Sequence, residues 1–153
     1  MKIYNIEQFK KDNNTYIYLI DKIYEFSKEL NRKFPSYKNW FYNQHIEGIG
    51  NGRATLFSTN DKGQINGICH LKANNNEKRI CYLYVGKDNK EDIDFRLLEK
   101  AFSYLNTTKP VVVLNLDNYI KYRGLIDEYN WKLKGINFNC EFSYNGKTRS
   151  KTK

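Results

Sequence analysis

The chain has few residues that could carry acid–base, nucleophilic or metal chemistry. It has 153 residues, with two histidines and three cysteines. Cys69 and His70 are adjacent in a stretch that reads as a strand, so their side chains are expected to face opposite ways. They cannot then share a metal ion, and with His45 far away in sequence neither a zinc site nor a Cys–His nucleophile pair is predicted. The cysteines are interpreted as free thiols in a reducing compartment.

Two further stretches combine residue types that bind anions. Glycines at 48, 50 and 52 resemble a phosphate loop, but they follow a helix and precede a strand, so we interpret them as a mobile loop. Residues 32–42 interleave cations with aromatic rings, as single-stranded nucleic-acid sites do, although an amphipathic helix with core rings gives the same pattern. The segment 147–153 has four cations and no acid, and it would add only salt-sensitive, nonspecific affinity.

Composition sets the broad class of the protein. There are 26 basic and 17 acidic residues, and the net charge of +9 favours anionic partners such as nucleic acid, phosphates or acidic proteins. The longest aliphatic run is 111–114, far shorter than a membrane-spanning helix requires. Since residues 1–11 also lack the apolar stretch of a signal peptide, the expected location is the cytoplasm, with no membrane contact.

Hydrophobic patterning predicts an α/β domain over residues 1–146, followed by a disordered basic tail at 147–153. The predicted strands are 1–6, 53–59, 64–72, 79–85, 111–116, 131–137 and 140–144. The predicted helices are 14–30, 37–46, 93–105 and one that begins at Asp117. A three-strand meander followed by a strand–helix–strand crossover implies a mixed sheet with helices on both faces.

Over residues 1–146 this order and several local sequences resemble the GNAT acyltransferases, which use acetyl-CoA to acylate amines. The matching segments are 37–41 with the glycine loop, 64–69, 79–85, 97–102 and 129–133. The resemblance implies a GNAT-like mixed sheet of about seven strands with about four helices on both faces. It also implies acetyl-CoA as cofactor and no metal.

The family's cofactor loop is where this sequence departs from the pattern. The family has an R/Q-x-x-G-x-G/A loop whose backbone N–H groups hold the CoA pyrophosphate at a helix N-terminus. Residues 87–94 contain no glycine, Lys90 stands near the family's arginine, and four acids lie between 88 and 94. The charge there opposes a pyrophosphate. The leading hypothesis is therefore a pseudoenzyme: a divergent GNAT-fold protein that has lost conventional acetyl-CoA binding and acts as a macromolecule-binding regulator or inhibitor.

The competing hypothesis is an active N-acetyltransferase acting on an amine. It requires strands 79–85 and 111–116 to splay apart around the pantetheine. By resemblance, backbone groups of Tyr84 and Val85 would hold the cofactor, with Lys87 and Lys90 near its phosphates.

Catalytic candidates follow from the same resemblance. Tyr122 lies one turn before Ile126, which occupies the position of the family's general acid, and could replace it; its alternative role is a core or rim tyrosine. Glu47 or His45 could be the general base, or each could be an ordinary solvated side chain.

A third hypothesis is nucleic-acid binding through residues 32–42 and the tail. By analogy the C-terminal strands could form a homodimer. The sequence identifies neither the protein partner nor the amine acceptor.

Overall fold

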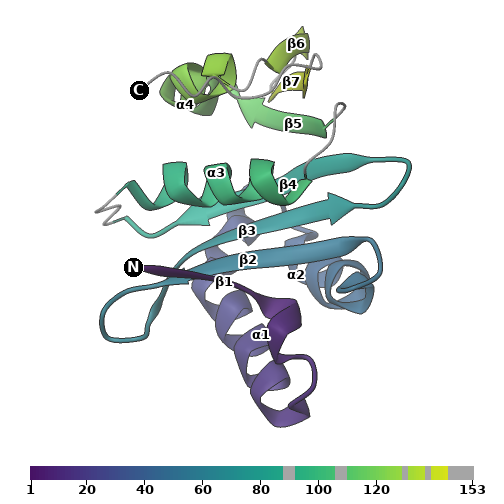
Figure 1. Ribbon diagram of the computed structural model, residues 1–153, viewed down its shortest axis with the longest axis vertical. Helices are drawn as coiled ribbons and strands as arrows, with labels where there is room; N and C mark the ends of the chain where they lie inside the picture. Colours follow the sequence, from purple (N-terminus) through teal and green to yellow (C-terminus); the bar gives the residue numbers. More distant parts are fainter. Residues whose placement is uncertain (88–91, 106–109, 129–130, 137–138, 145–153) are drawn as a thin grey trace.

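The computed structural model describes residues 1–87, 92–105, 110–128, 131–136 and 139–144 (Figure 1). The chain has the α/β class that its patterning predicts. Its described strands are β1 (Lys2–Asn5), β2 (Arg53–Thr59), β3 (Ile65–Ala73), β4 (Lys78–Val85), β5 (Pro110–Asn115), β6 (Trp131–Ile136) and β7 (Asn139–Tyr144). Its described α-helices are α1 (Asn13–Ser27), α2 (Tyr37–Trp40), α3 (Ile93–Leu105) and α4 (Leu116–Glu128).

The described strands form one sheet in the order β1-β2-β3-β4-β5-β7-β6. β4 and β5 are parallel, and the other neighbouring strands are antiparallel. The parallel pair arises because α3 carries the chain along one face of the sheet between these two strands, as a parallel connection requires. Figure 1 shows β5, α4, β6 and β7 beyond β4, at the opposite side of the sheet from β1.

Helix α1 begins and ends where its polar residues dictate. Asp12 caps its N-terminus and accepts a hydrogen bond from the Thr15 hydroxyl at 2.7 Å. The α-helix ends at Ser27, three residues before the predicted end, and continues as a 3₁₀ turn over Lys28–Arg32. The Ser27 hydroxyl donates to the Ile23 carbonyl at 2.8 Å, a contact that weakens regular helical bonding.

The helical segment after Pro35 is less regular than its aromatic spacing predicts. After α2 it widens into a π turn over Phe41–His45 and tightens into a 3₁₀ turn over Ile46–Gly48. The prediction of one regular helix over 37–46 is wrong in this respect. Tyr37, Phe41 and His45 are all fully buried. The π turn is a recurrent feature of functional sites.

Two cores lie on opposite faces of the sheet. One packs α3 and α4 against residues such as Cys69, and the other packs α1 and α2 against the face that carries His70. The prediction that Cys69 and His70 face opposite ways is confirmed. Gly67 lets α3 approach β3 closely, because a Cβ there would lie 2.7 Å from Leu97 Cδ1.

Candidate functional site

A β-bulge in β4 lies in the wall of a cleft. The register with β3 passes from His70↔Tyr82 to Leu71↔Ile80, so Cys81 is an extra residue in β4. The recorded pairing of β4 with β5 ends at the same place, at Ile80↔Val112. A bulge bends its strand and increases the local twist. The second half of β4 therefore diverges from β5, as the acetyltransferase hypothesis requires.

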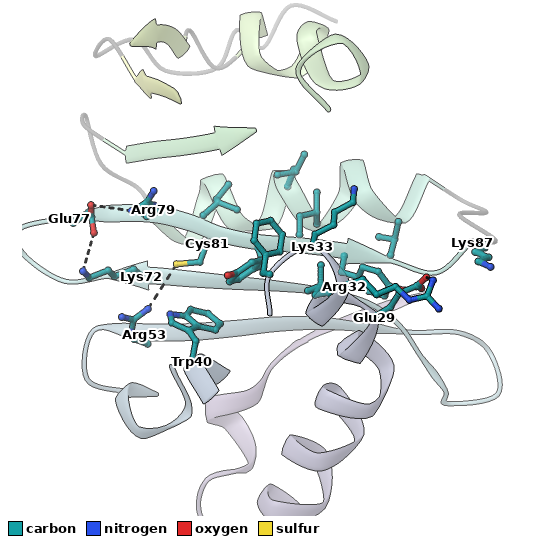
Figure 2. Close-up of a pocket in the computed structure, with 18 residues that line it drawn as sticks. Glu29, Arg32, Lys33, Trp40, Arg53, Lys72, Glu77, Arg79, Cys81 and Lys87 are labelled. Carbon is teal, nitrogen blue, oxygen red and sulfur yellow. Dashed lines mark hydrogen bonds and ion pairs between the residues drawn. The ribbon is translucent and has the colours of Figure 1, made fainter. Parts of the chain in front are cut away.

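The space opened by the bulge is a cleft of about 810 Å³, called here the β4 cleft (Figure 2). This volume lies in the range of small-molecule sites. Tyr82 and Tyr84 line it from the α1 side of the sheet, and Leu83, Val85 and Leu98 come from the α3 side. The described residues contribute six cations and two carboxylates to its lining: Arg32, Lys33, Arg53, Lys72, Arg79, Lys87, Glu29 and Glu77.

One end of the cleft lies where β4 finishes, beside the 3₁₀ turn that follows α1. The Tyr84 hydroxyl donates to Glu29 Oε2 at 2.8 Å, and this hydrogen bond lowers the pKa of Glu29. Arg32 lies 3.7 Å from the same carboxylate, and exposed Lys87 completes this group in Figure 2. Tyr84, Val85 and Lys87, which the sequence predicts as cofactor-binding residues, all line the cleft. Lys90 lies outside the described residues.

At the other end, three cations stand side by side on adjacent strands. Arg53 of β2 pairs with Lys72 of β3, which pairs with Arg79 of β4. We call these residues the cation row. Glu77 accepts from Lys72 at 3.0 Å and lies 3.8 Å from Arg79, and these contacts lower its pKa. Figure 2 shows this group around Cys81 and Trp40.

Aromatic side chains form the wall that joins the two ends. Tyr82 meets Phe34 edge to face at 5.2 Å between ring centroids and Trp40 at 4.9 Å. The Arg53 guanidinium lies over the Trp40 ring, 5.6 Å from its centroid. These rings give the middle of the cleft an aromatic wall on the α1 side.

Beneath this wall lies a buried chain of hydrogen bonds, the histidine network, formed by His45, Thr55, His70, Tyr37 and Ser27. Thr55 Oγ1 lies 2.7 Å from His45 Nε2 and 2.8 Å from His70 Nδ1. The Tyr37 hydroxyl lies 2.8 Å from His70 Nε2 and 2.7 Å from Ser27 Oγ. All five residues are fully buried. The sequence gave no sign of this network, because its members are distant along the chain.

Burial and one backbone bond together set the direction of the network. Burial lowers the pKa of His70 to about 3 and that of His45 well below its ordinary value, so both imidazoles are neutral at pH 7. Ser27 donates to a backbone carbonyl, so Tyr37 must donate to Ser27 and accept from His70 Nε2. Because neutral His70 carries its proton on Nε2, Thr55 donates to His70 Nδ1 and accepts from His45 Nε2.

Comparisons with known proteins agree with this geometry at the level of the fold. No protein-family model and no curated protein sequence matches the chain. The crystal structure of aminoglycoside 6'-acetyltransferase type Ii is similar, with a TM-score of 0.65 and 17% identity over 98% of this chain and 100% of that one. A GNAT-family acetyltransferase from Staphylococcus aureus Mu50 has a TM-score of 0.59 and 15% identity, over 95% of this chain and 100% of that one. The chain has the GNAT fold. PaiA N-acetyltransferase from Thermoplasma acidophilum, solved in complex with coenzyme A, has a TM-score of 0.57 and 14% identity, over 95% of this chain and 99% of that one.

Within this GNAT fold, Tyr122 belongs to the core rather than to the lining of the β4 cleft. It is 4% exposed, and its hydroxyl donates to Asp94 Oδ2 at 2.8 Å. Asp94 is fully buried and pairs with Lys121 Nζ at 2.6 Å. One of the four acids that the sequence places against a pyrophosphate therefore faces α4. Asp92 is exposed, and the other two acids lie outside the described residues.

The structure places the remaining predicted residues outside the cleft or in its walls. Glu47 is exposed on the 3₁₀ turn after the π turn, away from the cleft lining. In segment 32–42, Tyr37 and Phe41 are buried core rings, whereas Phe34 and Trp40 line the cleft. Gly50 and Gly52 adopt positive φ angles of 83° and 94°, which explains glycine at both.

The described residues form neither a metal cluster nor a membrane-spanning helix. They contain no group of three or more histidine, cysteine or acidic side chains that could hold a metal ion. No helix among them has the length and apolar character needed to cross a bilayer. The β4 cleft is the candidate site because cations and aromatic rings line it together.

Proposed function

We propose that this chain is an amine N-acyltransferase that uses acetyl-CoA or a related CoA thioester as acyl donor. The observation that carries the proposal is the bulge at Cys81, which separates β4 from β5 and opens a cationic cleft there. The GNAT fold supports it. The chain's substrate and activity are our inference, since the likeness to the acetyltransferases extends to the fold alone.

The described residues of the cleft fit a CoA thioester in shape and charge. Among them, the β4 edge after Ile80 has no recorded strand partner on the β5 side, so its backbone groups can bond a pantetheine amide. At the end of the cleft where β4 finishes, Arg32, Lys33 and Lys87 supply positive charges that can bind the CoA phosphates. When bound, the thioester would supply an activated acyl group to an amine.

The chain's own residues would position the amine and keep water away from it. The wall of Phe34, Trp40 and Tyr82 would limit the access of water to an amine bound in the middle of the cleft. Burial raises the pKa of the Cys81 thiol, so the thiol stays protonated at neutral pH and is a weak nucleophile. We therefore propose direct transfer to the amine, without an acylated cysteine. The C–N bond would form as the thioester C–S bond breaks, and the proton lost by the amine would leave with the sulfur as the free CoA thiol.

Calorimetric titration with acetyl-CoA tests the proposal. We expect micromolar affinity for the wild-type protein, weakened at least about tenfold by the double substitution Arg32→Glu and Lys87→Glu. The matched control is Lys62→Glu, which changes an exposed turn residue outside the cleft. It should leave the affinity unchanged.

The opposite result would return attention to the regulator hypothesis. If about 1 mM acetyl-CoA produces no binding heat with the wild-type protein, the cleft does not serve as a CoA site. The hypothesis of a macromolecule-binding regulator rests on the acidic segment 88–94, and the nucleic-acid hypothesis rests on residues 32–42. No described contact favours either one over the acyltransferase.

A further inference from the structure

We infer that the acceptor amine carries an oxyanion group, a carboxylate or a phosphate, which the cation row binds. This inference rests on the proposed function and adds the chemical class of the acceptor. It starts from the register of the sheet, which sets Arg53, Lys72 and Arg79 abreast on three neighbouring strands. All three line the β4 cleft at the end opposite to Lys87 (Figure 2).

The cation row is unfavourable for the fold alone. Like charges directly opposite each other in a sheet are destabilising. Glu77 is the carboxylate that the structure places among them, and it contacts Lys72 and Arg79. Within the described part of the chain, one carboxylate beside three cations leaves this group with a net charge of +2. A bound oxyanion would supply the missing charge.

Arg53 is positioned to bind an oxyanion. Among the ion pairs that the described residues form, none includes Arg53. Its guanidinium lies over the Trp40 ring, and Nη1 is 4.0 Å from Cys81 Sγ, the residue of the bulge. A stacked guanidinium keeps its hydrogen-bond donors free at its edge, in a fork that matches a carboxylate or phosphate.

The two cationic ends of the cleft therefore take different partners. Arg32, Lys33 and Lys87 lie near the end of β4, where we place the CoA phosphates. The cation row lies on the other side of the aromatic wall of Phe34, Trp40 and Tyr82, and we place the acceptor there. Polycationic amines are disfavoured there by charge repulsion, whereas an amine joined to an oxyanion is attracted.

The experiment compares amines that differ only in the anionic group. Alanylalanine is paired with alanylalanine amide, and phosphoethanolamine with ethanolamine; spermidine is the polycationic control. The rate of acetylation is measured from the release of free CoA. The binding of each amine on its own is measured by calorimetry. In one of the two pairs, we expect kcat/KM and affinity to be at least about tenfold higher for the compound that carries the anionic group than for its neutral counterpart. A difference in the alanylalanine pair identifies a carboxylate as the preferred group, and a difference in the phosphoethanolamine pair identifies a phosphate.

Variants assign the preference to the cation row. Arg53→Gln and Arg79→Gln should each reduce the acid preference severalfold, and Lys62→Gln should not. Arg53→Lys, which keeps the charge, should restore part of it. Unchanged acetyl-CoA affinity and thermal unfolding in each variant show that the cofactor end and the fold are intact.

The two proposals fail in different ways. Absence of acetyl-CoA binding by the wild-type protein overturns the acyltransferase proposal and this inference with it. Normal acetyl-CoA binding with equal response to acid and neutral amine, or with spermidine as the preferred acceptor, overturns this inference alone. A protein that binds acetyl-CoA but neither binds nor acetylates any of the oxyanion probes also overturns it.

Discussion

Acidification tests the histidine network more directly than any substitution. Both imidazoles are neutral in the folded protein, with pKa values below that of an exposed histidine. Below about pH 6.5 the unfolded chain therefore binds more protons than the folded one. Stability is fully present above that pH and is lost as the pH falls.

The size of the loss follows from the number of protons. Each histidine that stays neutral in the folded state while the unfolded state titrates costs about 1.4 kcal/mol per pH unit. Between about pH 6.5 and pH 5 this is about 2 kcal/mol for each, or about 4 kcal/mol for both. The chain has only these two histidines. Carboxylates such as Glu77, whose pKa is lowered from 4.5, add their own loss mainly below pH 5.

Urea denaturation at about pH 7.5 and pH 5 measures the difference. In the variant His45→Gln we expect the loss to fall to about half, because one titrating group remains. The wild-type comparison is sufficient if this variant does not fold. Equal stability at the two pH values, or greater stability at pH 5, would refute the neutral, one-directional network.

Three single substitutions test the packing around α3 and α4, each measured by urea denaturation. Gly67→Ala should lower the free energy of unfolding by about 1–3 kcal/mol, because its Cβ would overlap Leu97. Gly124→Ala, the same chemical change in α4 with open space around it, should raise stability by up to about 1 kcal/mol. Tyr122→Phe should lower stability by about 1–3 kcal/mol, because Asp94 loses a donor. The acetyl-CoA affinity of the Tyr122→Phe variant should equal that of the wild-type protein. If this variant instead loses turnover without losing stability, Tyr122 takes part in catalysis.

Local patterning predicts much of this fold because periodicity reports which face of an element is buried. Alternation places β2 at its observed bounds, 53–59, and helical spacing places α3 at 93–105. It fails at 37–46, where a π turn changes the period within one segment. Steps of four residues still bring Tyr37, Phe41 and His45 inward. Core aromatic rings are expected for this segment, and Tyr37 and Phe41 are buried. His45, expected to be a general base or a solvated side chain, is fully buried instead.

The site depends on contacts that periodicity does not contain. The pairing of Lys72 with Arg79 follows from the turn at 74–76, so register counting across that turn could have found two of the three residues of the cation row. The bulge could not be found this way, because Cys81 carries no residue-type signal for an extra position. The network joins Ser27 to Thr55 and His70 through tertiary packing alone.

The short junction between β4 and β5 has a mechanical consequence. Three residue pairs, from Lys78↔Pro110 to Ile80↔Val112, join the strands, and the Tyr122–Asp94 bond links α4 to α3. The strand pairs that join the two halves of the sheet therefore lie near one end of β4, and α3 and α4 share one hydrophobic core. A ligand that contacted both β4 and β5 would add a connection beyond those pairs. Its binding should slow hydrogen exchange in β5 as well as in β4, even though the two strands share only those three pairs.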